Sequence, residues 1–140
     1  MKRVLSEVKG EKRMRYTPEF DSTNGICIIR VTGEYQRPQD SDIMKHIAID
    51  IFTKQGYRLF LIDLTQAKVM SSTMSTFFAA NPKGELAEKL RKIRTAFVRR
   101  ELTADDHFYE NVAINRGFQL HAFDTLDKAV EWLKQTAAST

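Results

Sequence analysis

Apolar residues follow two different periods along the chain, and the first stretch has the alternation of strands. Met14–Phe20 and Ile26–Tyr35 are rich in β-branched and aromatic residues. Between them, Asn24 and Gly25 supply the positive φ that tight hairpin turns require. The sequence therefore predicts an N-terminal β-hairpin.

The next stretch has the period of a helix. Isoleucine recurs every four positions from Ile43 to Ile51, which predicts a helix that begins at Asp40 or Ser41 as N-cap and ends at Gly56. A nearly continuous apolar run then covers residues 57–64, the pattern of a parallel strand buried on both faces. This run predicts a central strand.

The remaining chain repeats the strand and helix units. A helix is expected to start within residues 70–73 and to turn Met74, Phe77 and Phe78 inward. Strands are expected over Thr95–Arg100 and Phe118–Phe123, and helices from residue 84 or 85, over Ala104–Asn115 and from Thr125. Such alternation predicts an α/β fold, with a mostly parallel sheet covered by helices.

Composition narrows the class of protein. The chain has 140 residues, 42% of them hydrophobic, and Cys27 is its single cysteine. We expect one globular α/β domain over residues 14–140 after a basic segment, residues 1–13. The first fifteen residues hold six basic and two acidic residues, so the formal charge of +4 lies there. No apolar run reaches the ~20 residues of a membrane span, and the expected location is the cytoplasm.

Motifs for metal, cofactor or nucleophilic chemistry are missing from the sequence. His46, His107 and His121 do not share a metal-ligand spacing with Cys27. The glycines form neither a dinucleotide fingerprint nor a P-loop, and no nucleophile elbow occurs. No nucleic-acid-binding signature follows the basic segment. We therefore predict a non-enzyme that has no cofactor, no metal and no nucleic-acid partner.

One local cluster carries a functional hypothesis. Ser71, Ser72 and Thr73 lie at the predicted start of a helix that follows a parallel strand. α/β proteins commonly bind ligands at this edge of the sheet, and a phosphate there would meet free backbone amides. The same hydroxyls also suit an ordinary helix cap. Residue chemistry leaves both interpretations open.

The segment Leu61–Ser75, LIDLTQAKVMSSTMS, resembles the strand, loop and helix start of STAS domains, the sulfate-transporter and anti-sigma-factor-antagonist family. Asp63–Thr65 matches the Asp-Leu-Ser of the family pattern. Ser72 and Thr73 fall on its two hydroxyl positions, the first of which is the family's phosphorylation site. Met74 stands where the family has glycine. The resemblance implies a phosphorylation or partner-docking site at this helix start.

The C-terminal part adds to this resemblance. Glu110–Gly117, Phe118–Phe123 and Thr125–Leu133 are similar to the ending of bacterial SpoIIAA-like single-domain proteins, which are grouped with STAS domains and the CRAL-TRIO lipid-transfer fold. The resemblance implies a mixed sheet of four to five strands, with helices mainly on one face and an antiparallel N-terminal strand.

Two functions follow as hypotheses. The first is a non-enzymatic regulatory or protein-interaction module, whose partner docks at Ser71, Ser72 and Thr73 and is released by phosphorylation. The second is a domain that binds a small apolar ligand or lipid. The residues expected to line that pocket are Met44, Phe52, Met74, Phe77 and Phe78. Self-association through Phe77, Phe78, Phe108 or Tyr109 is compatible with either hypothesis.

Overall fold

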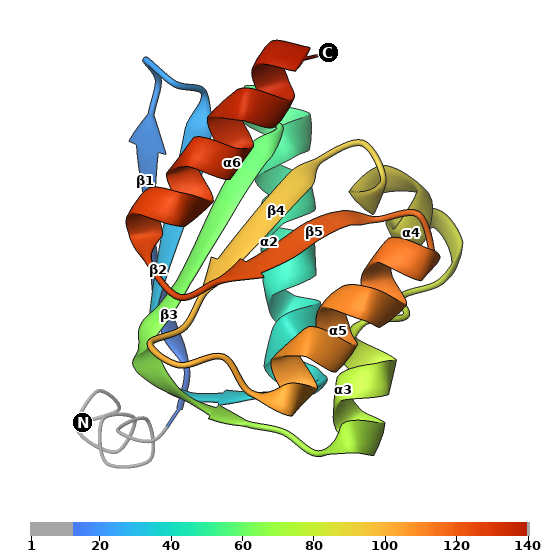
Figure 1. The fold of residues 1–140 in the computed structure, drawn as a ribbon. Coiled ribbons are helices and arrows are strands. Elements are labelled where there is room, and N and C mark those ends of the chain that lie inside the picture. Colours follow the sequence, from blue (N-terminus) through green and yellow to red (C-terminus); the bar gives the residue numbers. More distant parts are fainter. Residues whose placement is uncertain (1–12, 140) are drawn as a thin grey trace, which may run out of the picture.

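Strands and helices alternate along the chain, as the hydrophobic pattern predicts. The computed structural model describes residues 13–139, so most of the predicted basic segment lies outside the described residues. The elements, drawn in Figure 1, are β1 (Arg15–Asp21), β2 (Ile26–Gln36), α2 (Gln39–Gln55), β3 (Leu59–Met70), α3 (Thr73–Ala79), α4 (Gly84–Leu90), β4 (Arg94–Val98), α5 (Ala104–Asn115), β5 (Gln119–Phe123) and α6 (Leu126–Ser139).

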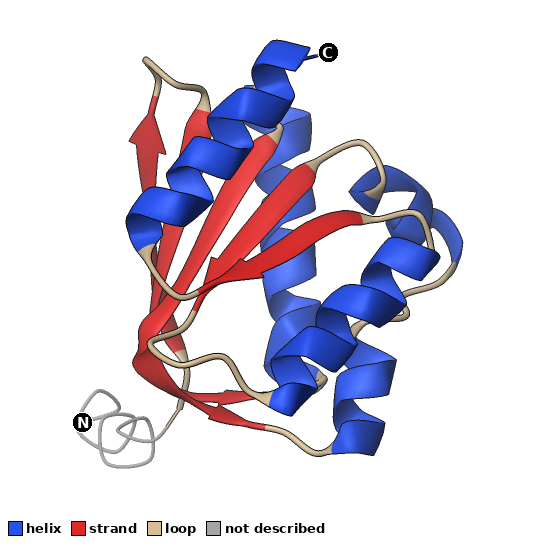
Figure 2. Cartoon of the chain, in the orientation of Figure 1, coloured by secondary structure: helices blue, strands red, loops and turns tan. Residues whose placement is uncertain are grey.

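The described strands form one five-stranded mixed sheet in the order β1-β2-β3-β4-β5. β1 is antiparallel to β2, and every other neighbouring pair is parallel. Asp21 accepts a hydrogen bond from the backbone N–H of Asn24 at 3.2 Å, and Gly25 has φ +70°. The mixed sheet and its N-terminal hairpin, both visible in Figure 2, confirm the expected fold class.

Helices cover the two faces of the sheet unequally. β3 shows the division, because Phe60 and Ile62 face a larger core while Leu59 and Leu61 face a smaller one. Side chains of α2, α3 and α5 fill the larger core, and α6 covers the smaller core from the opposite face. In Figure 1, α6 lies in front of the sheet and α2 behind it. Burial on both faces explains the continuous apolar run of this strand.

β3 is longer than the sequence predicts, since it continues through Thr65–Met70. This extension pairs in register with β2 alone, after a shift in which Arg30 opposes Asp63 but Thr32 opposes Gln66. The extra β3 residue forms a bulge. In the extension, exposed residues alternate with half-buried ones.

The sequence predicted the C-terminal end of α2 correctly but not its N-terminal end. Gly56 ends the helix as expected, with φ +80° and its N–H bonded to the Phe52 carbonyl. The predicted N-cap is wrong, because the helix begins one residue after Pro38 with no side-chain cap. Asp40 instead accepts a hydrogen bond from the Gln36 N–H at 2.7 Å, and Ser41 is buried.

Candidate functional site

The hydroxyl cluster lies at the junction of β3 and α3. Ser72 is the N-cap of α3: its Oγ accepts a hydrogen bond from the Ser75 N–H at 3.1 Å, and Ser75 Oγ accepts one from the Ser72 N–H at 2.7 Å. Ser71 Oγ donates to Asp105 Oδ2 on α5 at 3.1 Å. Ser71, Ser72 and Thr73 are all exposed. The cluster therefore caps a helix and is open to solvent.

The solvent face of α3 carries large apolar side chains. Met74 is 66% exposed and Phe78 57% exposed, and Met70, at the end of β3, is 39% exposed. Met74 and Phe78 lie one turn apart and so share a helix face. The prediction that these two turn inward is wrong, because the buried face of α3 is formed by Thr76 and Ala79. We refer to Met70, Met74 and Phe78 as the α3 patch.

The residues predicted to line an apolar pocket lie in different surroundings. Met44 is buried in the larger core, and Phe52 is half-buried at its margin. Phe77 is half-buried and meets the ring of Phe78 edge-on, with centroids 5.9 Å apart. Met74 is exposed. Of the five, Met44 alone lines the cavity that the structure forms in this core.

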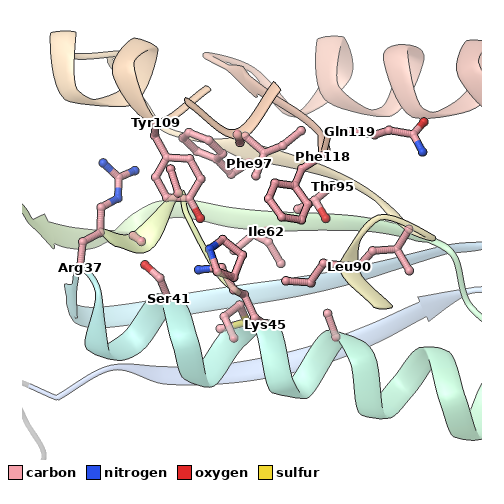
Figure 3. A pocket seen from close by; sticks show the side chains of 18 of the residues that line it. Arg37, Ser41, Lys45, Ile62, Leu90, Thr95, Phe97, Tyr109, Phe118 and Gln119 are labelled. Carbon is pink, nitrogen blue, oxygen red and sulfur yellow. The ribbon is translucent and has the colours of Figure 1, made fainter. Parts of the chain in front are cut away.

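That cavity, of about 80 Å³, lies between α2, α5 and the central strands, as Figure 3 shows. Its walls are mainly apolar and include Met44, Ala48, Ile62, Leu90, Phe97 and Phe118. Arg37, Ser41 and Lys45 form a polar end, and the half-buried Gln119 lies at the other end. The cavity thus has cationic side chains at one end and mainly apolar walls along its length.

A buried ion cluster stands beside the polar end. Arg37 Nη2 lies 2.9 Å from Asp106 Oδ1, with side chains 1% and 0% exposed. Arg99 Nη1 donates to both carboxylate oxygens, at 3.0 and 2.9 Å, and the Thr103 N–H donates to Oδ2. Burial acts to raise the pKa of Asp106, but the Thr103 hydrogen bond and the two guanidinium charges outweigh it and hold the pKa below its ordinary value.

Several buried donors at the polar end have no hydrogen-bond partner in the described part of the chain: Arg37 Nε and Nη1, Ser41 Oγ and Lys45 Nζ. A carboxylate oxygen of Asp42 lies 3.8 Å from Lys45 Nζ, beyond hydrogen-bond distance. Burial lowers the pKa of Lys45. Burial also raises the pKa of Tyr109, whose ring packs under the Arg37 guanidinium, to about 12. This phenol is therefore neutral at pH 7 and brings no negative charge to the polar end.

Two other polar side chains, Asp63 and His121, have partners within the fold. On the sheet, Asp63 accepts from Arg30 Nη1 at 2.9 Å. At the β5 edge, His121 Nδ1 lies 3.0 Å from Glu110 Oε2, which also accepts from the Ala122 N–H. Among the described residues, no group of three or more His, Cys, Asp or Glu is placed to hold a metal ion.

Cys27 and Tyr109 are both buried. Cys27 is buried and free, and burial raises the pKa of its thiol to about 11. Tyr109, predicted as part of a self-association surface, is buried in the larger core, so that part of the prediction is wrong.

None of the helices in the described range combines the length and apolar character needed to cross a bilayer.

The sequence analysis missed the buried charges of the cavity. The patterns along the chain give no role to Asp106, Arg37 or Lys45. A signal was available on α2, because Ser41, Met44, Lys45 and Ala48 are spaced three and four residues apart and so share one helix face. A lysine on the same face as Met44 and Ala48 points toward the interior.

This chain is similar to known proteins in its three-dimensional structure and not in its sequence. No family model matches the chain, and no curated protein matches it. The arrangement defines a class of α/β domain in which an antiparallel edge strand extends an otherwise parallel sheet.

Two solved structures share this architecture. An anti-sigma factor antagonist from Mycobacterium paratuberculosis matches with a TM-score of 0.52 and 16% identity, over 88% of this chain and 96% of that one. An uncharacterised protein with a SpoIIAA-like fold from Shewanella loihica matches with a TM-score of 0.51 and 14% identity, over 86% and 93%. The chain has a STAS/SpoIIAA-like fold, as the resemblance implied.

Proposed function

We propose that this protein is a non-enzymatic regulatory module that acts by docking another protein. The observation that carries the proposal is the exposed α3 patch beside the hydroxyl cluster. Large apolar side chains with this exposure are typical anchors of protein interfaces. The anti-sigma factor antagonist that shares the fold is named for its action on another protein, which supports a function of the same kind here.

The chemistry of the surface defines the partner. Met74 and Phe78 present two apolar anchors on one helix face, and Ser72 and Thr73 present hydroxyls at its start. The partner is therefore a protein with an apolar recess for the anchors and polar groups at the rim. Light scattering measures the molar mass of the purified chain in solution. A dimer would identify the partner as a second copy of this chain, and a monomer would leave a different protein as the partner.

Phosphorylation of Ser72 is the proposed switch. It would add about two negative charges beside the apolar anchors, where a partner surface must be desolvated. A phosphate at a helix N-terminus is compatible with α3, because free amides and the helix dipole favour negative charge there. Ser71 is less suitable, since its hydroxyl donates to the Asp105 carboxylate, which would repel a phosphate.

The docking test uses tagged protein expressed in its own source. Wild type, the double variant Met74→Ala/Phe78→Ala and the control Ile114→Ala are compared, since Ile114 is 41% exposed on α5. A candidate partner is then purified and titrated against all three. We expect the double variant to bind about 30-fold more weakly or worse, the effect of losing about 2 kcal/mol of anchor contacts. Equal binding of wild type and double variant would refute docking at the α3 patch.

The switch test uses the same purified partner. Ser72→Glu is compared with Thr125→Glu, because Thr125 Oγ1 also accepts a helix-start hydrogen bond, from the Lys128 N–H at 3.2 Å. Both variants alter a hydroxyl cap and add a negative charge, but Thr125 precedes α6 on the opposite face of the sheet. We expect Ser72→Glu to weaken binding and Thr125→Glu to leave it unchanged. Equal effects would contradict a switch at Ser72.

A further inference from the structure

The polar end of the cavity and the ion cluster beside it together hold more positive than negative charge. Arg37 and Arg99 share the single buried carboxylate of Asp106. Lys45 adds a third cation, whose ammonium group is buried. The carboxylate near it, that of Asp42, is 3.8 Å away on a side chain 58% exposed. Three cations thus face one buried carboxylate and one solvated carboxylate.

The unpaired atoms at this end are donors. Arg37 Nε and Nη1 and Lys45 Nζ can only donate hydrogen bonds, and the Ser41 hydroxyl is able to donate one. Buried polar groups in native proteins nearly always have partners, and a buried charge without one is costly. Figure 3 shows Ser41 and Lys45 extending from α2 toward Tyr109, with Arg37 at the same end. The partner that fits unpartnered donors gathered at one end of the cavity is an anion.

The apolar walls of the cavity determine which kind of anion fits it. Beyond the polar end, Ile62, Phe97 and Phe118 line the cavity and offer no charge. One water needs about 10–15 Å³ of such volume. The cavity, at about 80 Å³, therefore has room for a charged head group and a short apolar tail. A bare inorganic anion would leave the apolar length unfilled.

We propose that this cavity binds a short-chain organic carboxylate. Its head group accepts hydrogen bonds from Arg37, Ser41 and Lys45, and its tail lies against Ile62 and Phe97. Ala79 and Ala80, on the buried side of α3, line the cavity, whereas the α3 patch lies on the exposed side. The proposal does not depend on protein docking.

The first experiment titrates the full chain with butyrate at pH 7, followed by the amide spectra of the labelled protein and by thermal unfolding. Butyramide, which has the same shape without the charge, is the matched control ligand, and inorganic phosphate is the second. We expect butyrate to bind, to shift the amide signals of residues around the cavity and to raise the melting temperature. We expect butyramide to bind about tenfold more weakly or worse, because charge-assisted hydrogen bonds are lost.

The second experiment repeats the titration with Lys45→Met, which keeps the length of the side chain and removes its charge. Lys54→Met is the matched control on the same helix, because Lys54 is 71% exposed and its partner Asp50 is outside the cavity. We expect Lys45→Met to weaken butyrate binding about tenfold and Lys54→Met to leave it unchanged. Without ligand, Lys45→Met should melt no lower than wild type, because the variant removes a buried ammonium group that has no hydrogen-bond partner and only a solvated carboxylate 3.8 Å away.

Each other outcome overturns the proposal. Absence of butyrate binding to wild type, or equal binding of butyrate and butyramide, removes the anion-recognising site. Binding of phosphate with no binding of butyrate assigns the cavity to inorganic anions instead. Equal butyrate affinity of wild type and a folded Lys45→Met variant shows that the carboxylate binds elsewhere.

Discussion

Arg37, in the turn between β2 and α2, donates a hydrogen bond of 2.9 Å to Asp106 on α5, although the two residues are 69 positions apart. Both side chains are buried. Arg99, which follows β4, binds the same carboxylate. The carboxylate therefore joins the first crossover connection of the sheet to the last one before β5, and it does so next to the cavity.

Replacement of the shared carboxylate should be costly. Asp106→Asn leaves the buried guanidinium of Arg37 without an anion, so we expect the free energy of unfolding to fall by about 3–5 kcal/mol. Urea unfolding followed by circular dichroism measures this change. Asp105→Asn is the control, because Asp105 is half-buried and its bond to Ser71 is exposed, and should cost less than about 1 kcal/mol. Similar losses in the two variants would contradict a central role for Asp106.

The same carboxylate should make the fold sensitive to acid. The pKa of Asp106 in the folded state lies below its ordinary value of 3.8, because the Thr103 hydrogen bond and two guanidinium charges outweigh burial. Its contribution to the free energy of unfolding is therefore complete above about pH 4 and is lost as the pH falls through the folded-state pKa.

Urea unfolding between pH 7 and about pH 2.5 tests this dependence. We expect the difference in unfolding free energy between wild type and Asp106→Asn to shrink as the pH falls below about 4. A difference that stays constant over this range would show that Asp106 does not lose a stabilising negative charge there.

Local signals were sufficient for much of the fold. The Asn24-Gly25 turn and the left-handed Gly56 both appear where the sequence placed them, because their geometry depends on a few neighbouring residues. The extension of β3 was missed because it depends on pairing with β2, which no local pattern in Thr65–Met70 records. Non-local pairing decided the length of this strand.

The candidate sites also differ in how well the local sequence predicts them. Ser72 was predicted as a helix-start hydroxyl, and the structure makes it the N-cap of α3. The cavity was missed because its lining combines side chains from α2, the central strands and α5 that are far apart in sequence. The inward prediction for Met74 and Phe78 failed for a different reason: a seven-residue helix buries one narrow face, which Thr76 and Ala79 already occupy.

The bulge in β3 should depend on one buried carboxylate. Asp63 Oδ1 accepts hydrogen bonds from the Thr65 N–H at 3.0 Å and from Thr65 Oγ1 at 2.6 Å, and Oδ2 accepts one from Arg30. Asp63→Ala leaves these donors unpaired, so we expect a loss of about 1–3 kcal/mol in unfolding free energy. Urea unfolding provides the measurement.

Glu19→Ala is the matched control for Asp63→Ala, because Glu19 pairs with the same Arg30 from the exposed strand β1. The side chains of that pair are 43% and 50% exposed. Exposed ion pairs contribute about 0–1 kcal/mol, so this variant should remain close to wild type. A loss for Glu19→Ala that equals the loss for Asp63→Ala would mean that Arg30, rather than the bulge, accounts for the effect.

Gly33 should tolerate a side chain less well than Gly25 does, although both have positive φ. At Gly33, φ is +84° and an added Cβ would collide with the carbonyl oxygen of Arg13, whose backbone forms a bridge with Glu34. At Gly25, φ is +70° and no atom lies within 4 Å of such a Cβ. Gly25→Ala therefore isolates the cost of the left-handed backbone, about 1 kcal/mol, while Gly33→Ala adds a backbone displacement.

We expect thermal and urea unfolding to show a loss for Gly33→Ala that exceeds the loss for Gly25→Ala by about 1 kcal/mol or more, because the carbonyl of Arg13 is backbone and cannot rotate away as a flexible side chain would. The bridge between Arg13 and Glu34 would then have to open or shift. Equal losses at the two glycines would mean that the start of the described chain moves aside at no cost, and that its contact with Gly33 does not stabilise the sheet.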